Sequence, residues 1–115
     1  MIDIVELVSS TLTSIGVKSA FQSYPPGPNG LPSEYVTFLE YTSNPSLEAA
    51  DKEIETERLI QVNVWSKGNF HQLVEDIRKK LEQEGLQRIS EFDAPYTDGD
   101  SHFNKVLRFA FFDEY

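Results

Sequence analysis

The chain has 115 residues, 39% of them hydrophobic and 12% aromatic, which is the size and composition of one domain with a single core. It contains no cysteine, so disulfides, thiolate catalysis and cysteine-bound zinc or iron–sulfur clusters are excluded. Its formal charge is −9, and a surface of that sign repels phosphate backbones, so we expect no sequence-specific binding of nucleic acid.

The sequence shows no sign of a membrane segment. No apolar run approaches the ~18 residues that cross a bilayer, and the first residues lack the basic and then apolar pattern of a signal peptide. We therefore expect no membrane partner and a protein that stays in the cytoplasm where it is made.

The first predicted element is a helix over residues 2–17. Asp3 and Glu6 lie in its first turn, where carboxylates suit the positive end of the helix dipole, and Gly16 ends it. A short strand is expected next, over residues 18–24. The apolar positions that define one face of the helix are Ile4, Leu7, Val8, Leu12 and Ile15.

Residues 25–32 contain four prolines and two glycines. Proline has no amide hydrogen and forces the preceding residue toward an extended conformation, so this segment is predicted to be a projecting loop outside the sheet. A polyproline ligand remains an alternative.

A second strand is predicted over residues 34–41. Both of its faces are partly apolar, which indicates that a helix covers one face and that something else, such as a neighbouring subunit, shields part of the other. One face carries Tyr35, Thr37, Leu39 and Tyr41, and the other carries Val36, Phe38 and Glu40.

Residues 42–55 are polar and are expected to lie outside the sheet. Asn44-Pro45-Ser46 predicts a turn, and residues 47–51 are expected to form a helical turn. The most negative part of the sequence begins here. Its acidic residues are Glu48, Asp51, Glu53, Glu55 and Glu57.

The strand around which the domain is organised is predicted over residues 57–66. Ile60, Val62 and Val64 alternate with polar residues and Trp65, so one face is aliphatic and buried. A helix is then expected over residues 69–84, ended by Gly85. At its start, Asn69 is predicted to be the N-cap, with Gln72 closing a capping-box-like pair.

Two more strands are predicted, over residues 86–92 and 102–112, joined by a loop at 93–100 with the turn pair Asp98-Gly99. The predicted order is α-β-β-β-α-β-β. This order is typical of an α+β fold in which two helices pack on one face of a small, mainly antiparallel sheet. We predict one domain, residues 1–115.

Residues suited to catalysis are few. The two histidines are His71, expected to be a surface residue, and His102, which follows Asp98 and Asp100 closely enough for a metal site to be considered. That segment lacks the ligand spacing of a calcium loop, and no second histidine or cysteine completes a zinc site. No Gly-x-Ser-x-Gly motif or phosphate-binding loop is present. We expect no catalytic residues, no metal and no cofactor.

Several segments, in their order and spacing, resemble the small tail-completion proteins of long-tailed bacteriophages and prophages, also called tail terminators or head-to-tail joining proteins. The resemblance spans nearly the whole chain. Its segments are Tyr35-Val-Thr-Phe38 after the proline loop, the acidic lead-in 51–57, Ile60-Gln-Val-Asn-Val-Trp-Ser-Lys-Gly68 opening a helix, the helix exit Gly85-Leu-Gln-Arg88, and Tyr96-Thr-Asp98 before His102-Phe-Asn-Lys-Val-Leu-Arg-Phe109.

The resemblance implies a non-enzymatic structural protein of α+β fold that caps the head-proximal end of the tail tube and joins tail to head. Such proteins are expected to be monomers before assembly and to form a ring, expected to be hexameric, in the virion. The implied partners are copies of the chain, the tail-tube protein and the head connector protein. The implied location is the virion, and the host bacterial cytoplasm during assembly.

The family has no catalytic residues to transfer, so we nominate an assembly surface on physical grounds. An acidic loop that lines a ring would repel DNA and let it pass. Alternatives left open are a head-closure or connector adaptor protein, a small metal-dependent hydrolase, and a regulatory adaptor that binds proline-rich or acidic motifs. The nominated residues are Asp51, Glu53, Glu55, Glu57, Pro26, Asn29, Tyr96 and Asp98.

Overall fold

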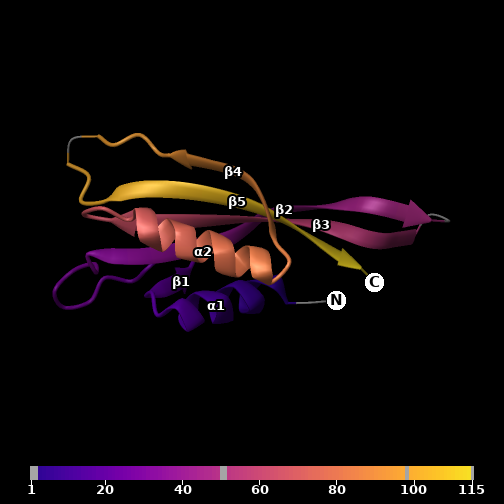
Figure 1. Cartoon of the computed structure of the whole chain (residues 1–115), viewed down its shortest axis with the longest axis horizontal. Helices are drawn as coiled ribbons and strands as arrows, with labels where there is room; N and C mark the ends of the chain where they lie inside the picture. The colour runs from indigo at the N-terminus through magenta and orange to yellow at the C-terminus, as the bar shows by residue number, and fades with distance from the viewer. Residues whose placement is uncertain (1–2, 50–51, 98, 115) are drawn as a thin grey trace.

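The computed structural model describes residues 3–49, 52–97 and 99–114, with the backbone alone for residues 44–49, 52–55 and 114. Within them the chain forms two helices and one five-stranded sheet (Figure 1), which confirms the predicted α+β class and element order. The elements are α1 (Ile4–Ile15), β1 (Ser19–Phe21), β2 (Glu34–Ala49), β3 (Lys52–Ser66), α2 (His71–Gln83), β4 (Gln87–Asp93) and β5 (Phe103–Glu114).

The strand order in the sheet is β1-β2-β3-β5-β4. β1 runs parallel to β2, and the other neighbours are antiparallel. Both helices lie on the same face of the sheet (Figure 1). β5 is the last element in the sequence, yet it is an inner strand that separates β3 from β4.

The core lies between the helices and this face of the sheet. Ile60, Val62 and Val64 are buried as predicted, and their antiparallel partners across the sheet place Val36 and Leu107 on the same face. Each helix contributes one apolar stripe, because residues three and four positions apart share a helix face. The buried helix residues of the core are Ile4, Val8 and Leu12 of α1, and Val74, Ile77 and Leu81 of α2.

Helix α1 has a defined cap at each end. Asp3 is the N-cap residue, and its Oδ1 accepts a hydrogen bond of 3.1 Å from the amide of Glu6. Gly16 ends the helix with φ of 89°, a left-handed conformation that glycine adopts without the steric cost of a Cβ. Both ends therefore follow from single residues that the sequence identifies.

Replacing Asp3 with alanine is expected to lower the free energy of unfolding by about 1 kcal/mol. The substitution removes the side-chain acceptor from the first turn of α1, whereas Asp3→Asn keeps an oxygen at that position. Urea denaturation of the two variants measures the difference. An equal loss in both would show that charge, and not the capping hydrogen bond, is what matters.

Helix α2 begins differently from the prediction. It starts at His71, and Phe70 occupies the N-cap position without a side-chain cap. The Oδ1 of Asn69 accepts from the amide of His71 at 3.0 Å, whereas Gln72 donates its Nε2 to Asp76 at 2.9 Å. The predicted capping box is therefore wrong. Asn69 forms a local turn ahead of the helix, and Gln72 finds an acceptor one helical turn further on.

Residues 42–49 and 52–57 form an extended β-hairpin, here called the arm, instead of the predicted turn and helical turn. The backbone of β2 continues to Ala49 and pairs with β3 as far as Ala49 opposite Lys52. A register shift follows directly after Pro45, between Pro45 and Leu47. β1 ends at Phe21, so β2 is an edge strand along the arm, where proline is tolerated.

The arm extends past both helices at one end of the molecule (Figure 1). The end of β5 adds a third strand at its base, where Phe112 lies opposite Glu57. The prediction failed here because the backbone groups of residues 42–49 find their hydrogen-bond partners on another strand and not within a local turn. The other predicted elements differ from the structure only at their ends.

Candidate functional site

The nominated assembly residues that the structure describes lie at two opposite ends of a molecule 54 Å long (Figure 1). Glu53 and Glu55 belong to β3 within the arm, and Glu57 is half-buried near its base. Pro26, Asn29 and Tyr96 are exposed on loops at the other end. Asp51 and Asp98 lie outside the described residues. The structure therefore divides the nominated set into an arm end and a loop end.

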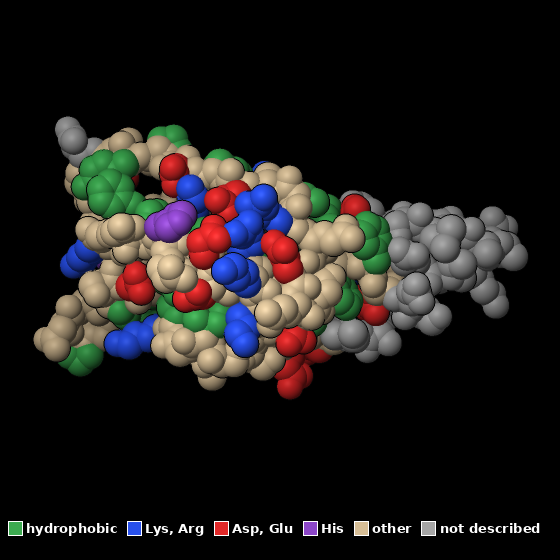
Figure 2. Space-filling view, in the orientation of Figure 1, with side chains coloured by type: hydrophobic (Ala, Val, Ile, Leu, Met, Phe, Trp, Pro, Cys, Tyr) green, Lys and Arg blue, Asp and Glu red, His purple; other side chains and the backbone are tan. Residues whose placement is uncertain are grey.

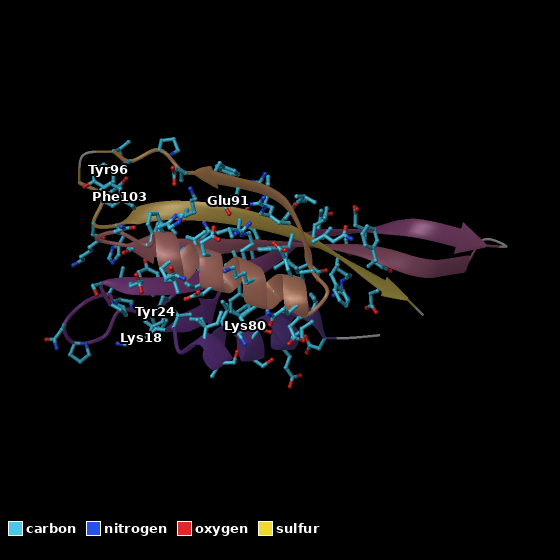
Figure 3. All side chains as sticks on the ribbon, in the orientation of Figure 1. Lys18, Tyr24, Lys80, Glu91, Tyr96 and Phe103 are labelled. Atoms are coloured by element: carbon cyan, nitrogen blue, oxygen red, sulfur yellow. The ribbon has the colours of Figure 1, made fainter. Side chains whose placement is uncertain are left out.

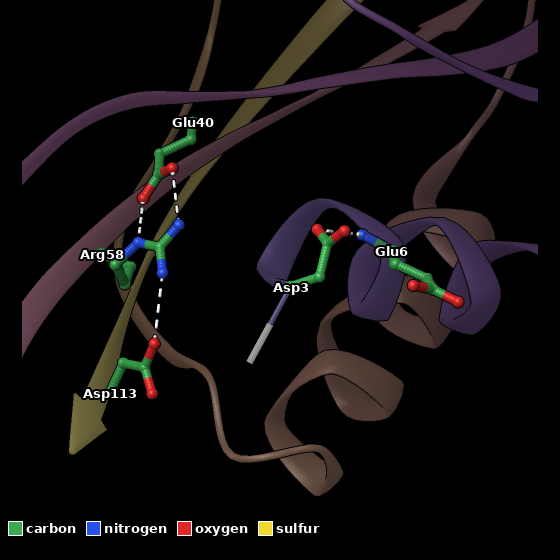
Figure 4. A network of polar contacts seen from close by, with 5 residues as sticks. All are labelled: Asp3, Glu6, Glu40, Arg58 and Asp113. Carbon is green, nitrogen blue, oxygen red and sulfur yellow. Dashed lines mark hydrogen bonds and ion pairs between the residues drawn. The ribbon is translucent and has the colours of Figure 1, made fainter. Parts of the chain in front are cut away.

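An ion-pair cluster fixes the base of the arm (Figure 4). The guanidinium of Arg58, on β3, donates from Nε and Nη2 to the carboxylate of Glu40, the latter bond at 2.9 Å, and from Nη1 to Asp113 at 3.2 Å. Asp113 is only 3% exposed. The hydrogen bond to Glu40 is the main cause that raises the pKa of Arg58 above its ordinary value. The cluster joins β2, β3 and β5.

Sequence reasoning missed this cluster, although one signal was present. Glu40 shares the predicted strand face of Val36 and Phe38, and a carboxylate on an apolar face needs a cation beside it. The identity of that cation depends on strand register. Glu40 and Arg58 are neighbours because of the way β2 pairs with β3, and the sequence does not show that pairing.

The proline loop lies outside the sheet, as predicted, but it folds back on itself. Gly27 and Gly30 exchange two backbone hydrogen bonds of 3.0 Å, and Gly30 has φ of +85°. A groove of about 550 Å³ lies between the loop and β1. Its lining includes Lys18, Tyr24 and Asn29. The loop therefore has a defined, hydrogen-bonded conformation. Its role as a polyproline ligand stays a prediction.

Aromatic side chains gather where the proline loop meets β2 and β3. The ring of Tyr35 lies 5.2 Å from Tyr24, stacks at 5.9 Å on Trp65, and meets His102 edge-on at 5.2 Å. Burial raises the pKa of Tyr35. The sequence placed Tyr35 on one strand face, but only the register of Tyr35 opposite Trp65 brings these rings together.

His102 is buried and both of its ring nitrogens are occupied. Nε2 lies 2.7 Å from the carbonyl oxygen of Pro32, and Nδ1 lies 2.6 Å from the hydroxyl of Ser101. Because a carbonyl can only accept, Nε2 carries the proton and Nδ1 accepts from Ser101. This imidazole ties the loop before β5 to the proline loop, and it has no lone pair left for a metal ion.

The loop between β4 and β5 is ordered around Asp100. Its Oδ2 accepts from the amide and from the hydroxyl of Thr97, each at 2.9 Å. The Tyr96 hydroxyl donates to the Asp100 carbonyl at 2.9 Å. The hydrogen bond from the Thr97 amide is the main cause that lowers the pKa of Asp100 below its ordinary value of 3.8. The carboxylate form therefore holds this loop.

We expect this loop to loosen in acid. Folding lowers the pKa of Asp100, so its contribution to stability is present above the ordinary value of 3.8 and is lost as pH falls through the lower folded value. Amide exchange of Thr97 should accelerate over that range, measured by NMR. In Asp100→Asn the acceleration should disappear, and its persistence would assign the effect to another group.

His71 is exposed, as predicted, and it lines a small hollow of about 190 Å³ together with Glu75, Glu91 and Asp93. Acidic and basic side chains alternate over α2 on this face (Figure 2). Within the described part of the chain, no group of three or more histidine and acidic side chains is placed to hold a metal ion. Each carboxylate instead has a cation: Glu75 with Arg78, Glu91 with Arg88, and Asp93 with Lys105.

The sheet face opposite the helices carries its own polar and aromatic cover. The guanidinium of Arg108 lies between the rings of Tyr41 and Phe92, at 5.4 and 5.3 Å from their centres, and its Nε donates to Gln61 at 3.1 Å. Tyr41, Phe92 and Phe112 nevertheless remain exposed. We call this the open face.

No family model and no curated protein matches the chain. Neither described helix is long and apolar enough to pass through a bilayer. The functional assignment therefore draws on the geometry above and on the resemblance of the sequence segments.

Proposed function

We propose that this chain is a structural virion assembly protein, which caps the head-proximal end of a phage tail tube and joins the tail to the head. The observation that carries the proposal is the open face, where Tyr41, Phe92 and Phe112 are exposed and Phe112 lies at the base of a projecting arm. Exposed apolar residues that share one face are typical of a surface that another protein covers.

Copies of the chain are the proposed partners on this face. One subunit's open face packs against a different surface of the next, and such head-to-tail contacts close into a ring when the rotation between subunits allows it. The outer edge of β4 is a second contact, since an edge strand can be extended by another chain. Ring closure with six copies, from monomers before assembly, is the expected state.

The arm is proposed to face the DNA passage of the ring. Its acidic residues would repel the phosphate backbone and keep DNA from binding to the wall. Charge reversal of Asp51, Glu53 and Glu55 to lysine tests this role, with tail joining as the readout. If tail joining proceeds unchanged in this variant, the arm does not line the DNA passage.

Electron microscopy of lysates from phage that lack this protein tests the function itself. Overlong or unjoined tails beside filled heads are the expected result, because tail growth would lack its stop and its docking surface. Heads that have lost their DNA beside tails of normal length would instead favour the head-closure adaptor. Normal virions would overturn both roles.

A further inference from the structure

A cavity of about 280 Å³ lies at the loop end of the molecule, beside the loop between β4 and β5. Small-molecule sites commonly measure ~300–1,000 Å³, so this cavity is of a size that suits a single large side chain. The residues that line it are Tyr35, Trp65, Ala94, Pro95, Tyr96, Asp100, Ser101, His102 and Asn104.

Two of the aromatic residues that line the cavity already use their polar hydrogens within the molecule. Trp65 uses its indole Nε1 to donate to Thr37 at 3.0 Å, and Tyr96 uses its hydroxyl on the Asp100 carbonyl. Trp65 and Tyr35 stack with only 11° between their planes. Ring faces are electron-rich, and they attract cations.

The cavity contains one unpaired buried acceptor and one carboxylate. Asn104 Oδ1 is buried and has no hydrogen-bond partner among the described residues. Asp100 supplies the single formal charge in the lining, which contains no lysine or arginine. A buried acceptor without a donor is costly, so the cavity favours a ligand that is positively charged and brings several donors.

We propose that this cavity binds the guanidinium group of an arginine side chain from a partner protein. A guanidinium is planar and stacks on aromatic rings, and its fork of N–H donors suits two acceptors at once, here Asn104 Oδ1 and the Asp100 carboxylate. Tyr96 lines the cavity and is 52% exposed. The ring of Phe103, which is 45% exposed, lies 4.7 Å from the ring of Tyr96 (Figure 3). They provide apolar contact for the chain on either side of the arginine.

An arginine of a different protein is favoured over one from a second copy of this chain. Each arginine of this chain is already engaged within its own molecule, and would have to give up that contact first. The four are Arg58 with Glu40 and Asp113, Arg78 with Glu75, Arg88 with Glu91, and Arg108 with Gln61 and two rings. Binding of arginine in this cavity does not depend on a role in a virion.

Trp65 is the only tryptophan of the chain, so its fluorescence reports on the cavity directly. The probes are the capped tripeptide Gly-Arg-Gly, the same peptide with neutral citrulline in place of arginine, and free arginine. A saturable change of emission with the arginine peptide, and binding roughly tenfold weaker for the citrulline peptide, are expected because a charged donor is lost. Equal binding of both peptides, or no response to either, would overturn the proposal. Free arginine that binds as tightly as the peptide would assign the cavity to a metabolite and not to a partner protein.

Two variants locate the binding within the molecule. Asp100→Asn keeps an oxygen acceptor for Thr97 but removes the charge, and is expected to weaken binding of the arginine peptide roughly tenfold. Glu82→Gln removes a charge from an exposed position on α2, away from the cavity, and should leave binding unchanged. NMR spectra of both variants check that the fold is intact. Equal weakening in the two variants would show that overall charge attracts the peptide, and would reject the cavity as its site.

Discussion

Phe109→Ala is expected to lower the free energy of unfolding by about 4 kcal/mol, enough to unfold many domains of this size. Phe109 is 0% exposed and lies on β5 opposite Ile60 of β3 and Arg88 of β4. Its ring belongs to the core that both helices cover. Removal leaves a cavity that the surrounding strands cannot fill without moving. Urea denaturation followed by circular dichroism measures the loss.

Phe112 provides the matched control, because it lies on the same strand but on the open face. It is 41% exposed, so Phe112→Ala should cost less than about 1 kcal/mol. Similar losses for Phe109→Ala and Phe112→Ala would mean that the open face is as tightly packed as the helix-covered face. The proposal of an assembly surface there would then lose its physical basis.

Arg58→Met is expected to cost about 3 kcal/mol. Methionine preserves the apolar stem of the side chain but removes the cation that Glu40 and Asp113 share. The two carboxylates would then repel each other at the base of the arm, with Asp113 still buried. Thermal and urea denaturation give the loss of global stability, and amide exchange shows whether it is concentrated where β2, β3 and β5 meet.

The control for this substitution is Arg88→Met. Arg88 pairs with Glu91 at 3.3 Å and is 40% exposed, and exposed ion pairs contribute about 0–1 kcal/mol. Arg58→Lys adds a further comparison. A lysine carries the charge but not the planar fork that contacts two carboxylates at once, so its loss should fall between the other two. An Arg58→Met variant as stable as Arg88→Met would contradict the role assigned to the cluster.

The parts of the fold that local patterns determine were predictable from the sequence. The alternation of Ile60, Val62 and Val64 identified the buried face of β3, and Asp3 and Gly16 identified the ends of α1. These features depend on the period of side-chain direction and on residues a few positions apart.

The arm was not predictable by the same means. Asn44-Pro45-Ser46 has strong local turn propensity, but the pairing of Pro45 with Thr56 draws the segment into an extended ladder. An antiparallel partner satisfies the backbone groups of a polar segment without any need for apolar side chains. Nothing in the spacing of residues 42–55 carries that information.

The candidate sites depend on still longer separations. His102 donates from Nε2 to the carbonyl of Pro32, 70 residues away in the sequence, and Arg58 donates to Asp113 across 55 residues. The sequence indicated that His102, Tyr96 and Asp100 lie close together along the chain. It could not indicate that Tyr35 and Trp65 would complete a cavity around them, because that follows from strand register.

The position of β5 has a consequence for how the protein is made. The sheet cannot be completed until Phe103–Glu114 has been synthesised. This segment forms β5, which pairs with β4 on one side and with β3 on the other. A nascent chain that stops before residue 103 would expose β4, α2 and the aliphatic face of β3 together. Folding of the sheet is therefore expected to wait until β5 has been synthesised, and products truncated before β5 should be insoluble or quickly degraded in the cell.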